Sequence, residues 1–245
     1  MRDAIARAVD DAPPGDATLG RITLKPHQCA AVRHLRRALR TYGGALLADA
    51  PGLGKTYTAL ALARDTGPCV VAAPASLRRM WREAAATADV PIAFVSLERL
   101  SRGTPVPPAA FVIIDEAHHA SNPRTRRYAA LAAAAATARV LLLSATPVRN
   151  RSAERDALLA LFLGGRAASA TDDMLAQCIV RRDTAGEATP DVERRAPVRL
   201  PMTPGIGARI VALPPPVAPA DGADATALVR LGLARAWASS VAALD

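Results

Sequence analysis

The chain has 245 residues, a length that suits one large α/β domain or a domain with an appendage. Its formal net charge of +9 favours a polyanionic partner such as nucleic acid, although an arginine-rich composition can also reflect genomic base bias. Three widely spaced cysteines argue against a disulfide framework and a zinc site. The N-terminus and the Ala-rich stretch at 128–148 are too polar for a secretory signal or a membrane span, so we expect a cytoplasmic protein, associated with the nucleoid in a bacterium.

The first firm element of the chain is predicted after residue 20. Residues 1–20 indicate an N-terminal extension, with a short helix and a Pro/Gly-rich linker. Apolar residues then recur at helical spacing from Ala30 to Leu39, and Gln28 lies at the entry to this helix. A glutamine offers a donor and an acceptor, the pair that can bind the amino edge of adenine. Gln28 is therefore a candidate nucleotide contact, with an ordinary surface position on the helix as the alternative.

The segment Asp49–Thr56, with the sequence DAPGLGKT, predicts a binding site for a nucleoside triphosphate. It follows a short apolar run and precedes an Ala/Leu-rich one, so the order is strand, loop and helix. Glycines let a ligand approach the loop backbone, and a helix N-terminus attracts phosphate. A lysine reaches the terminal phosphates and a hydroxyl ligates Mg²⁺. The binding residues predicted here are Gly52, Leu53, Gly54, Lys55 and Thr56, with Lys55 also catalytic.

The match to the phosphate-loop pattern G-x-x-x-x-G-K-[ST] is imperfect. The pattern would place a glycine where this chain has Asp49, so that Gly52 is the substitute pivot. An ordinary glycine turn before a helix is the alternative. Lysine usage argues against that alternative, because Lys25 and Lys55 are the only lysines in a chain with 31 Lys and Arg residues. A chain that otherwise uses arginine has a lysine where a phosphate loop needs one.

A second strand is predicted at Cys69–Ala73, followed by a helix for which Ser76 is the expected N-cap. One face of this helix is apolar and includes Trp81. The opposite face carries Arg78, Arg79 and Arg82. These arginines either form a solvated helix face or contact a phosphate backbone.

An acidic pair follows the most apolar strand of the sequence. After a strand at 92–95 and a Pro-rich loop at 101–110, the run Phe111–Ile114 is typical of a strand buried on both faces of a parallel sheet. Asp115 and Glu116 come next. One carboxylate would order Mg²⁺ through water and the other would polarise the attacking water in phosphoryl transfer, with simple helix capping as the alternative. His118 is a further candidate for nucleotide binding.

The last predicted strand of the domain is Val140–Leu143, after an Ala-rich helix that Arg124, Arg126 and Arg127 precede. Hydroxyl groups of Ser144 and Thr146 lie just beyond it and are placed to sense a γ-phosphate; ordinary turn chemistry is the alternative. Strands alternate with helices throughout, which predicts an α/β fold with a mainly parallel sheet covered on both faces. Each candidate site follows a strand's carboxyl end, where such folds bind ligands.

Taken together, these motifs resemble the Swi/Snf-type family of superfamily 2 helicase-like ATPases, which are double-stranded DNA translocases. The resemblance covers about residues 20–200, with the motifs in the family's order and spacing: LKPHQ at 24–28, DAPGLGKT at 49–56, APASLRRMWREA at 73–84, DEAHHASN at 115–122 and LLLSATPVRN at 141–150. Residues 154–164 are similar to the family's helical continuation, and Val180–Arg182 to its basic strand leading out of the first lobe. This chain departs from the family at Asp49–Pro51 and at Ser144–Thr146, which puts the exact branch in doubt more than ATP binding.

The resemblance implies a three-layer RecA-like P-loop lobe at 21–200, with ATP and Mg²⁺ as its ligands. By this resemblance, Gln28 would contact adenine, and Asp115 and Glu116 would bind the metal and the attacking water. Ser144 and Thr146 would couple the nucleotide state to DNA. Residues 201–245 then indicate an irregular, Pro/Ala-rich linker and a terminal helix at 225–244, without the family's second RecA-like lobe.

The expected partners are double-stranded DNA and a second RecA-like lobe, which a separate chain could supply. No membrane partner is expected. A non-catalytic nucleotide- or DNA-binding regulatory module is the main alternative. A P-loop enzyme acting on a small molecule is another.

Overall fold

The computed structural model describes residues 17–144, 152–182, 209 and 212. The chain divides into two compact units, Met1–Thr189 and Pro190–Asp245, and the described part of the first unit contains every helix and strand discussed below. The helix predicted at 225–244 lies outside the described residues, and of the predicted linker before it only residues 209 and 212 are described.

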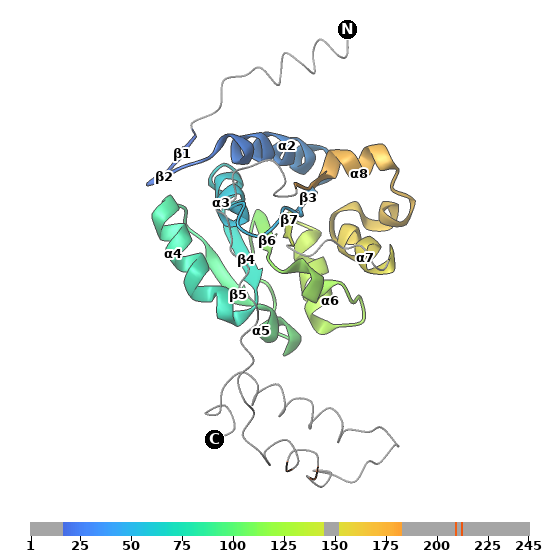
Figure 1. Ribbon diagram of the computed structural model, residues 1–245. Helices are drawn as coiled ribbons and strands as arrows, with labels where there is room; N and C mark the ends of the chain where they lie inside the picture. The colour runs from blue at the N-terminus through green and yellow to red at the C-terminus, as the bar shows by residue number, and fades with distance from the viewer. Residues whose placement is uncertain (1–16, 145–151, 183–208, 210–211, 213–245) are drawn as a thin grey trace. The chain divides into compact units, whose positions relative to one another are not determined.

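A six-stranded sheet forms the centre of the first unit (Figure 1). Its order is β5-β4-β6-β7-β3-β8, and every neighbouring pair is parallel. The strands are β3 (Gly44–Leu47), β4 (Cys69–Ala73), β5 (Ala93–Ser96), β6 (Phe111–Ile114), β7 (Arg139–Leu143) and β8 (Ile179–Val180). The all-parallel sheet confirms the predicted fold class.

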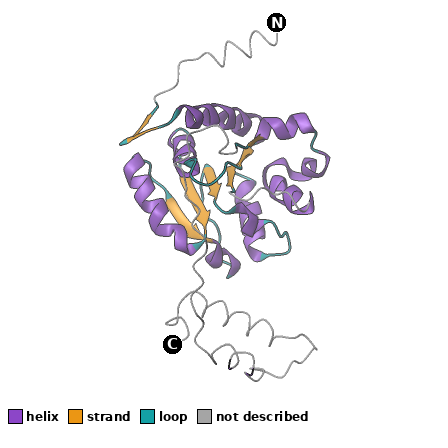
Figure 2. Cartoon of the chain, in the orientation of Figure 1, coloured by secondary structure: helices purple, strands orange, loops and turns teal. Residues whose placement is uncertain are grey.

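Helices cover both faces of the sheet and make three layers (Figures 1 and 2). One face packs against α2 (Pro26–Tyr42), α3 (Lys55–Arg64) and α4 (Arg78–Ala88). The other packs against α5 (Leu97–Ser101), α6 (Arg126–Ala135) and α7 (Ser152–Leu163). A last helix, α8 (Asp172–Cys178), lies beside α2, and short 3-10 turns are η1 (Ala75–Leu77), η2 (Ala117–Ala120) and η3 (Gly164–Ser169).

The sheet is held by alternation of side chains between two apolar clusters. In β4 and β6, Val71 and Ile113 face the α2–α4 layer, whereas Val70 and Val112 face the α5–α7 layer. All four residues of β6 are buried, as the apolar run predicted for a strand covered on both faces. Gly44 shows how closely the layers approach, because a Cβ there would lie 2.3 Å from the Phe162 side chain of α7. A larger residue at position 44 would push α7 off the sheet.

A two-stranded antiparallel hairpin precedes α2 and is absent from the elements predicted by the sequence. It comprises β1 (Thr18–Leu19) and β2 (Ile22–Thr23), and so includes residues on both sides of the predicted boundary at residue 20. Gly20 turns the hairpin at φ 56°, and the Arg21 N–H donates to the Thr87 carbonyl at 3.0 Å. The hairpin is thereby fixed to the last turn of α4.

The start of α4 differs from the prediction. Ser76 is not its N-cap, because η1 occupies 75–77 and α4 begins at Arg78. A tertiary contact explains the extra turn: the Ala75 N–H donates to the Glu98 carboxylate at 3.1 Å.

The helices among the described residues are too short or too polar to span a lipid bilayer.

Candidate functional site

The carboxyl ends of β3, β6, β7 and β8 bring the polar segments of the chain to one edge of the sheet. Parallel register aligns Leu47 with Leu143 and Val180, and Ile114 with Leu142. The residues that follow these strand ends therefore share one edge, where ligands bind in open α/β sheets. Asp49, Asp115, Ser144 and Arg182 all belong to this group.

Two glycines shape the loop between β3 and α3. Gly52 and Gly54 have φ values of 86° and 76°, a left-handed conformation that other residues rarely adopt. A Cβ at Gly54 would also lie 2.1 Å from the Gln28 amide nitrogen. Because Gly54 is the N-cap of α3 and has no side chain to cap it, the first N–H groups of this helix are suited to an anion.

Lys55 points into the loop that precedes it. Its Nζ donates to the carbonyl oxygens of Asp49 at 2.8 Å and Ala50 at 3.2 Å. Burial lowers the pKa of the Lys55 ammonium, and the carboxylates of Asp49, Asp115 and Glu116 oppose that shift. The opposing carboxylates show that the lysine and the acidic pair lie within electrostatic reach of one another.

Gln28 is buried and its amide group contacts the loop. Nε2 donates to the carbonyl oxygens of Leu53 at 3.4 Å and Gly54 at 3.3 Å, while Oε1 accepts from the Lys25 N–H at 2.8 Å. His27 Nε2 also lies 3.2 Å from the Leu53 carbonyl oxygen. Gln28 therefore ties the start of α2 to the loop, and the surface position weighed as its alternative is wrong; its contact with adenine stays a prediction.

Asp115 lies at the end of β6 and is held by two donors. The buried Trp81 indole Nε1 donates to Oδ2 at 2.9 Å, and the Glu116 N–H donates to Oδ1 at 2.9 Å. Burial raises the pKa of Asp115, whereas these two hydrogen bonds lower it. Each oxygen thus has a fixed orientation, which is what a metal-binding carboxylate requires of its surroundings.

Glu116 follows in a left-handed conformation, with φ 50° and ψ 50°. Its Oε2 lies 3.2 Å from His118 Nδ1. The His118 and His119 rings are tilted by 38° relative to each other, with centroids 4.1 Å apart. His118 is placed to orient the Glu116 carboxylate, while its own contact with nucleotide stays a prediction.

The hydroxyl candidates differ in their surroundings. Thr56 Oγ1 donates to the Met80 sulfur at 3.9 Å, so this hydroxyl lies between α3 and α4. Ser144 is buried, and its N–H donates to the Leu47 carbonyl at 3.1 Å, continuing the pairing of β7 with β3. Thr146 lies outside the described residues.

The donor set fits Mg²⁺ bound together with phosphate. Among the described residues, no group of three or more His, Cys, Asp or Glu side chains could hold a metal by itself. Mg²⁺ usually takes one or two protein ligands and completes its shell with water and phosphate oxygens. Thr56 and Asp115 would hold the ion in this way, and Lys55 would meet the same phosphates.

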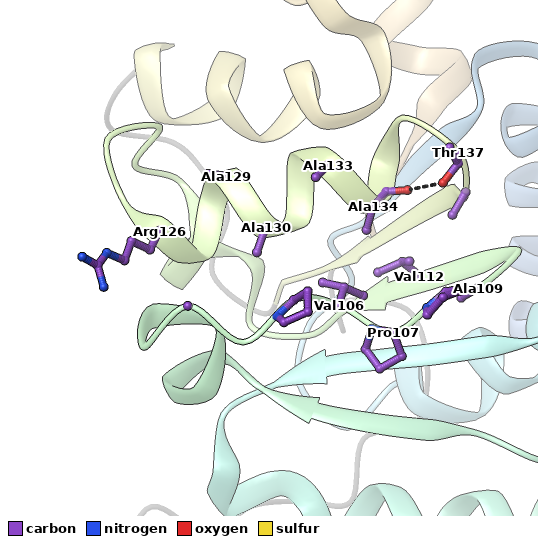
Figure 3. A pocket seen from close by; sticks show the side chains of 14 residues that line it. Val106, Pro107, Ala109, Val112, Arg126, Ala129, Ala130, Ala133, Ala134 and Thr137 are labelled. Atoms are coloured by element: carbon purple, nitrogen blue, oxygen red, sulfur yellow. Dashed lines mark hydrogen bonds between the residues drawn. The ribbon is translucent and has the colours of Figure 1, made fainter.

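A separate apolar pocket of about 540 Å³ lies between α6 and the Pro-rich segment before β6 (Figure 3). Residues of α6, of the segment before β6 and of the turn before β7 line it, and none of them belongs to the loop between β3 and α3. Arg126 is its only charged lining residue, and Figure 3 shows that side chain pointing away. Its lining is mostly apolar, with Thr137 and Arg126 as the only polar side chains.

No protein-family model matches the chain. It is 34% identical over 158 residues to the SWI/SNF-related matrix-associated actin-dependent regulator of chromatin subfamily A-like protein 1 of Bos taurus, covering 54% of this chain and 16% of that protein. The protein of the same name from Xenopus tropicalis is 35% identical over 144 residues, covering 48% of this chain and 15% of that protein. The chain thus spans about a sixth of the length of these relatives.

The fold is also similar to solved structures. The Sulfolobus solfataricus SWI2/SNF2 ATPase core in complex with dsDNA superposes with a TM-score of 0.59 and 19% identity, over 70% of this chain and 47% of that one. The chain is thus similar in sequence to SWI/SNF-related proteins over about half of its length, and in fold to a SWI2/SNF2 ATPase core. The core domain of the same Sulfolobus protein, a second structure, gives a TM-score of 0.54 and 18% identity, over 72% of this chain and 46% of that one.

Two residues that orient this site are absent from the site residues that the sequence predicts. Trp81 was assigned to an apolar helix face, and Arg182 only to a basic strand. A buried tryptophan usually has a hydrogen-bond partner for its indole N–H. The acidic residues of the sequence were therefore candidate partners for Trp81. Arg182 pairs with Asp49, 133 residues away, and no local pattern indicates such a partner.

Replacing Trp81 by phenylalanine should weaken Mg²⁺ binding at this site. Phenylalanine fills much of the same space but leaves Asp115 Oδ2 without its 2.9 Å donor. Outer-shell partners of metal ligands are typically worth about 10–100-fold, so the Mg²⁺ concentration for half-maximal nucleotide binding should rise about tenfold. A magnesium titration followed with a fluorescent ATP analogue measures it. Trp237→Phe, at the other tryptophan, is the control, and equal magnesium dependence in both variants would contradict the role.

Proposed function

We propose that this chain is the ATP-binding lobe of a DNA-dependent ATPase that translocates on double-stranded DNA. Turnover in this proposal requires a second RecA-like lobe, whichever chain supplies it. The lobe described here provides the phosphate loop, the acidic pair and one wall of the nucleotide site.

One observation carries the proposal: Lys55 and the acidic pair meet at a single edge of the sheet. The loop that holds Lys55 follows β3 and the acidic pair follows β6, and the parallel registers of β3, β7 and β6 bring these strand ends to the same edge. A lysine beside a loop of N–H groups suits the terminal phosphates of ATP, and the neighbouring carboxylates suit metal and water. The convergence supports phosphoryl transfer more than binding alone, because binding needs no second carboxylate.

The roles divide among residues with different surroundings. Lys55 neutralises phosphate charge, Gln28 holds the loop in shape, and Glu116 orients the attacking water. Bound Mg²⁺ would supply further positive charge at the phosphates, with Thr56 and Asp115 as its protein ligands.

The arginines of α4 support DNA as the partner. Arg79 is exposed and pairs with Glu83 at 2.7 Å, and the Arg78 guanidinium lies 5.0 Å from the centre of the Phe94 ring. Because α4 follows the carboxyl end of β4, its first turn begins on the same edge as the nucleotide site. Phosphate contacts there would place DNA beside the machinery that responds to ATP.

The test combines nucleotide binding, DNA binding and hydrolysis. We expect the chain to bind a fluorescent ATP analogue, and to bind duplex DNA with an affinity that falls steeply as salt rises. Hydrolysis by the chain alone should be slow, and adding a second lobe should raise it by about 10³–10⁵ if that lobe brings an arginine finger. Hydrolysis is measured by phosphate release, with and without duplex DNA.

Three outcomes would contradict parts of this proposal. Absence of nucleotide binding would exclude the proposed ATPase activity. An affinity for duplex DNA that does not change with salt would exclude DNA as the partner. Robust DNA-stimulated hydrolysis by the chain alone would show that no second lobe is required. Binding of nucleotide and DNA without hydrolysis under any condition would favour the regulatory module.

A further inference from the structure

The phosphate loop begins with a fully buried carboxylate. Asp49 is 0% exposed, at the position where the phosphate-loop pattern has a glycine. Removing a charge from water is costly unless the group is paired and hydrogen-bonded. The fold therefore has to provide Asp49 with a partner.

That partner is Arg182, directly beyond β8. Its Nε donates to Asp49 Oδ1 at 3.1 Å and its Nη2 pairs with Oδ2, a two-point contact that only a planar guanidinium makes. The remaining arm, Nη1, donates to the His27 carbonyl. One arginine thus joins three segments: the phosphate loop, the start of α2 and the end of β8.

Backbone hydrogen bonds join the same two segments, the start of the phosphate loop and the end of β8. The Ala48 N–H donates to the Val180 carbonyl at 2.7 Å, and the Ala50 N–H to the Arg182 carbonyl at 3.0 Å. Asp49 lies between these two bonds, and its own carbonyl accepts from Lys55 Nζ at 2.8 Å. Asp49 therefore connects Arg182, through its side chain, to the phosphate-binding lysine, through its backbone.

The strand that precedes this arginine has few backbone hydrogen bonds. β8 has two residues, lies at the edge of the sheet and pairs only with β3 among the described strands. Elements with few backbone bonds open more easily than the core. The side-chain contact with Asp49 is thus a substantial part of what keeps residues 179–182 beside the loop.

We propose that Arg182 is a positioning residue that holds the phosphate loop in its nucleotide-binding shape through Asp49. This inference rests on the proposed nucleotide site. Its consequence is reciprocal, because two linked equilibria must affect each other equally. Docking of β8 favours nucleotide binding, and bound nucleotide favours docking of β8. The nucleotide state is thereby transmitted to residues 179–182.

The variants separate positioning from general stability. Arg182→Ala leaves Asp49 charged and buried without its partner, so the affinity for a fluorescent ATP analogue should fall about tenfold, within the range for contacting residues. Asp49→Asn in the Arg182→Ala background removes the stranded charge and should recover part of the loss. Arg182→Lys should be intermediate, since lysine keeps the charge but not the two-point contact.

Arg36→Ala is the matched control. Arg36 pairs with Asp65 on the surface, where both side chains are more than a third exposed. Its loss should leave nucleotide affinity unchanged, because exposed pairs contribute little. Thermal unfolding of every variant shows whether affinity and stability change together.

Hydrogen exchange of the wild-type chain gives an independent reading that needs no variant. Saturating ATP analogue should slow exchange of the amides at 179–182 by about tenfold, as reciprocity requires for the same coupling. Failure of the wild-type chain to bind nucleotide would overturn the proposed function and this inference together. Nucleotide binding with an unchanged Arg182→Ala affinity would overturn the inference alone. If Arg182→Ala does not fold, unaltered exchange at 179–182 in the wild type overturns it.

Discussion

Replacing Lys55 by alanine should abolish nucleotide binding and leave the empty lobe folded. Lys55 bonds to two loop carbonyls without nucleotide, and burial already lowers its pKa, so the empty site gains little from its charge. With ATP bound, the same ammonium would meet phosphate oxygens through charge-assisted bonds. Two such bonds are worth ~3 kcal/mol or more, which corresponds to a loss of about 100-fold or greater in affinity.

Titration with a fluorescent ATP analogue measures that loss, and circular dichroism monitors folding. Arg40→Ala is the control, because Arg40 is an exposed cation in the last turn of α2. Equal affinities for Lys55→Ala and the wild type would exclude the loop as the phosphate site. A large fall in melting temperature would instead give Lys55 a structural role.

Replacing Glu116 by glutamine should separate binding from hydrolysis. Glutamine has nearly the same size and can still contact His118, but it cannot accept a proton from water. General base catalysis contributes about 10²–10⁴-fold, so the turnover number measured with a second lobe and saturating DNA should fall by that factor. Nucleotide affinity should change little, because Glu116 is the partly exposed member of the acidic pair and contacts no loop backbone in the bonds described.

Phosphate release and analogue titration are the two measurements. Glu83→Gln, at an exposed glutamate paired with Arg79, is the matched control and should keep its turnover. Loss of turnover in both variants would point to a general electrostatic effect. Unchanged turnover in Glu116→Gln would assign the water-activating role to another residue.

The layers of this fold could be predicted because they depend on local periodicity. The bounds of β4 and β6 match the apolar runs Cys69–Ala73 and Phe111–Ile114, where every residue is buried. Strands at the centre of a parallel sheet are continuous in hydrophobicity, so their sequence signal is strong. The same reasoning placed Asp115 and the phosphate loop at strand ends, and the structure confirms that they share an edge.

The contacts that orient the site could not be predicted in the same way. Trp81 reaches Asp115 across 34 positions and Arg182 reaches Asp49 across 133, distances over which propensity carries no information. The hairpin β1–β2 was missed because its strands have two residues each, too few for a periodic pattern. Its docking on α4, rather than its own sequence, defines it.

The level register of the strands makes length a stricter constraint than identity. Ile114, the last residue of β6, aligns with Ala72 and Leu142, so β6 ends within one residue of its two neighbours β4 and β7. Many apolar residues could serve inside β6, but one inserted residue would advance Asp115 by about 3.3 Å and turn it to the opposite face. In related sequences, insertions should therefore accumulate in the segment 101–110 before this strand, while the four-residue span of the strand itself stays constant.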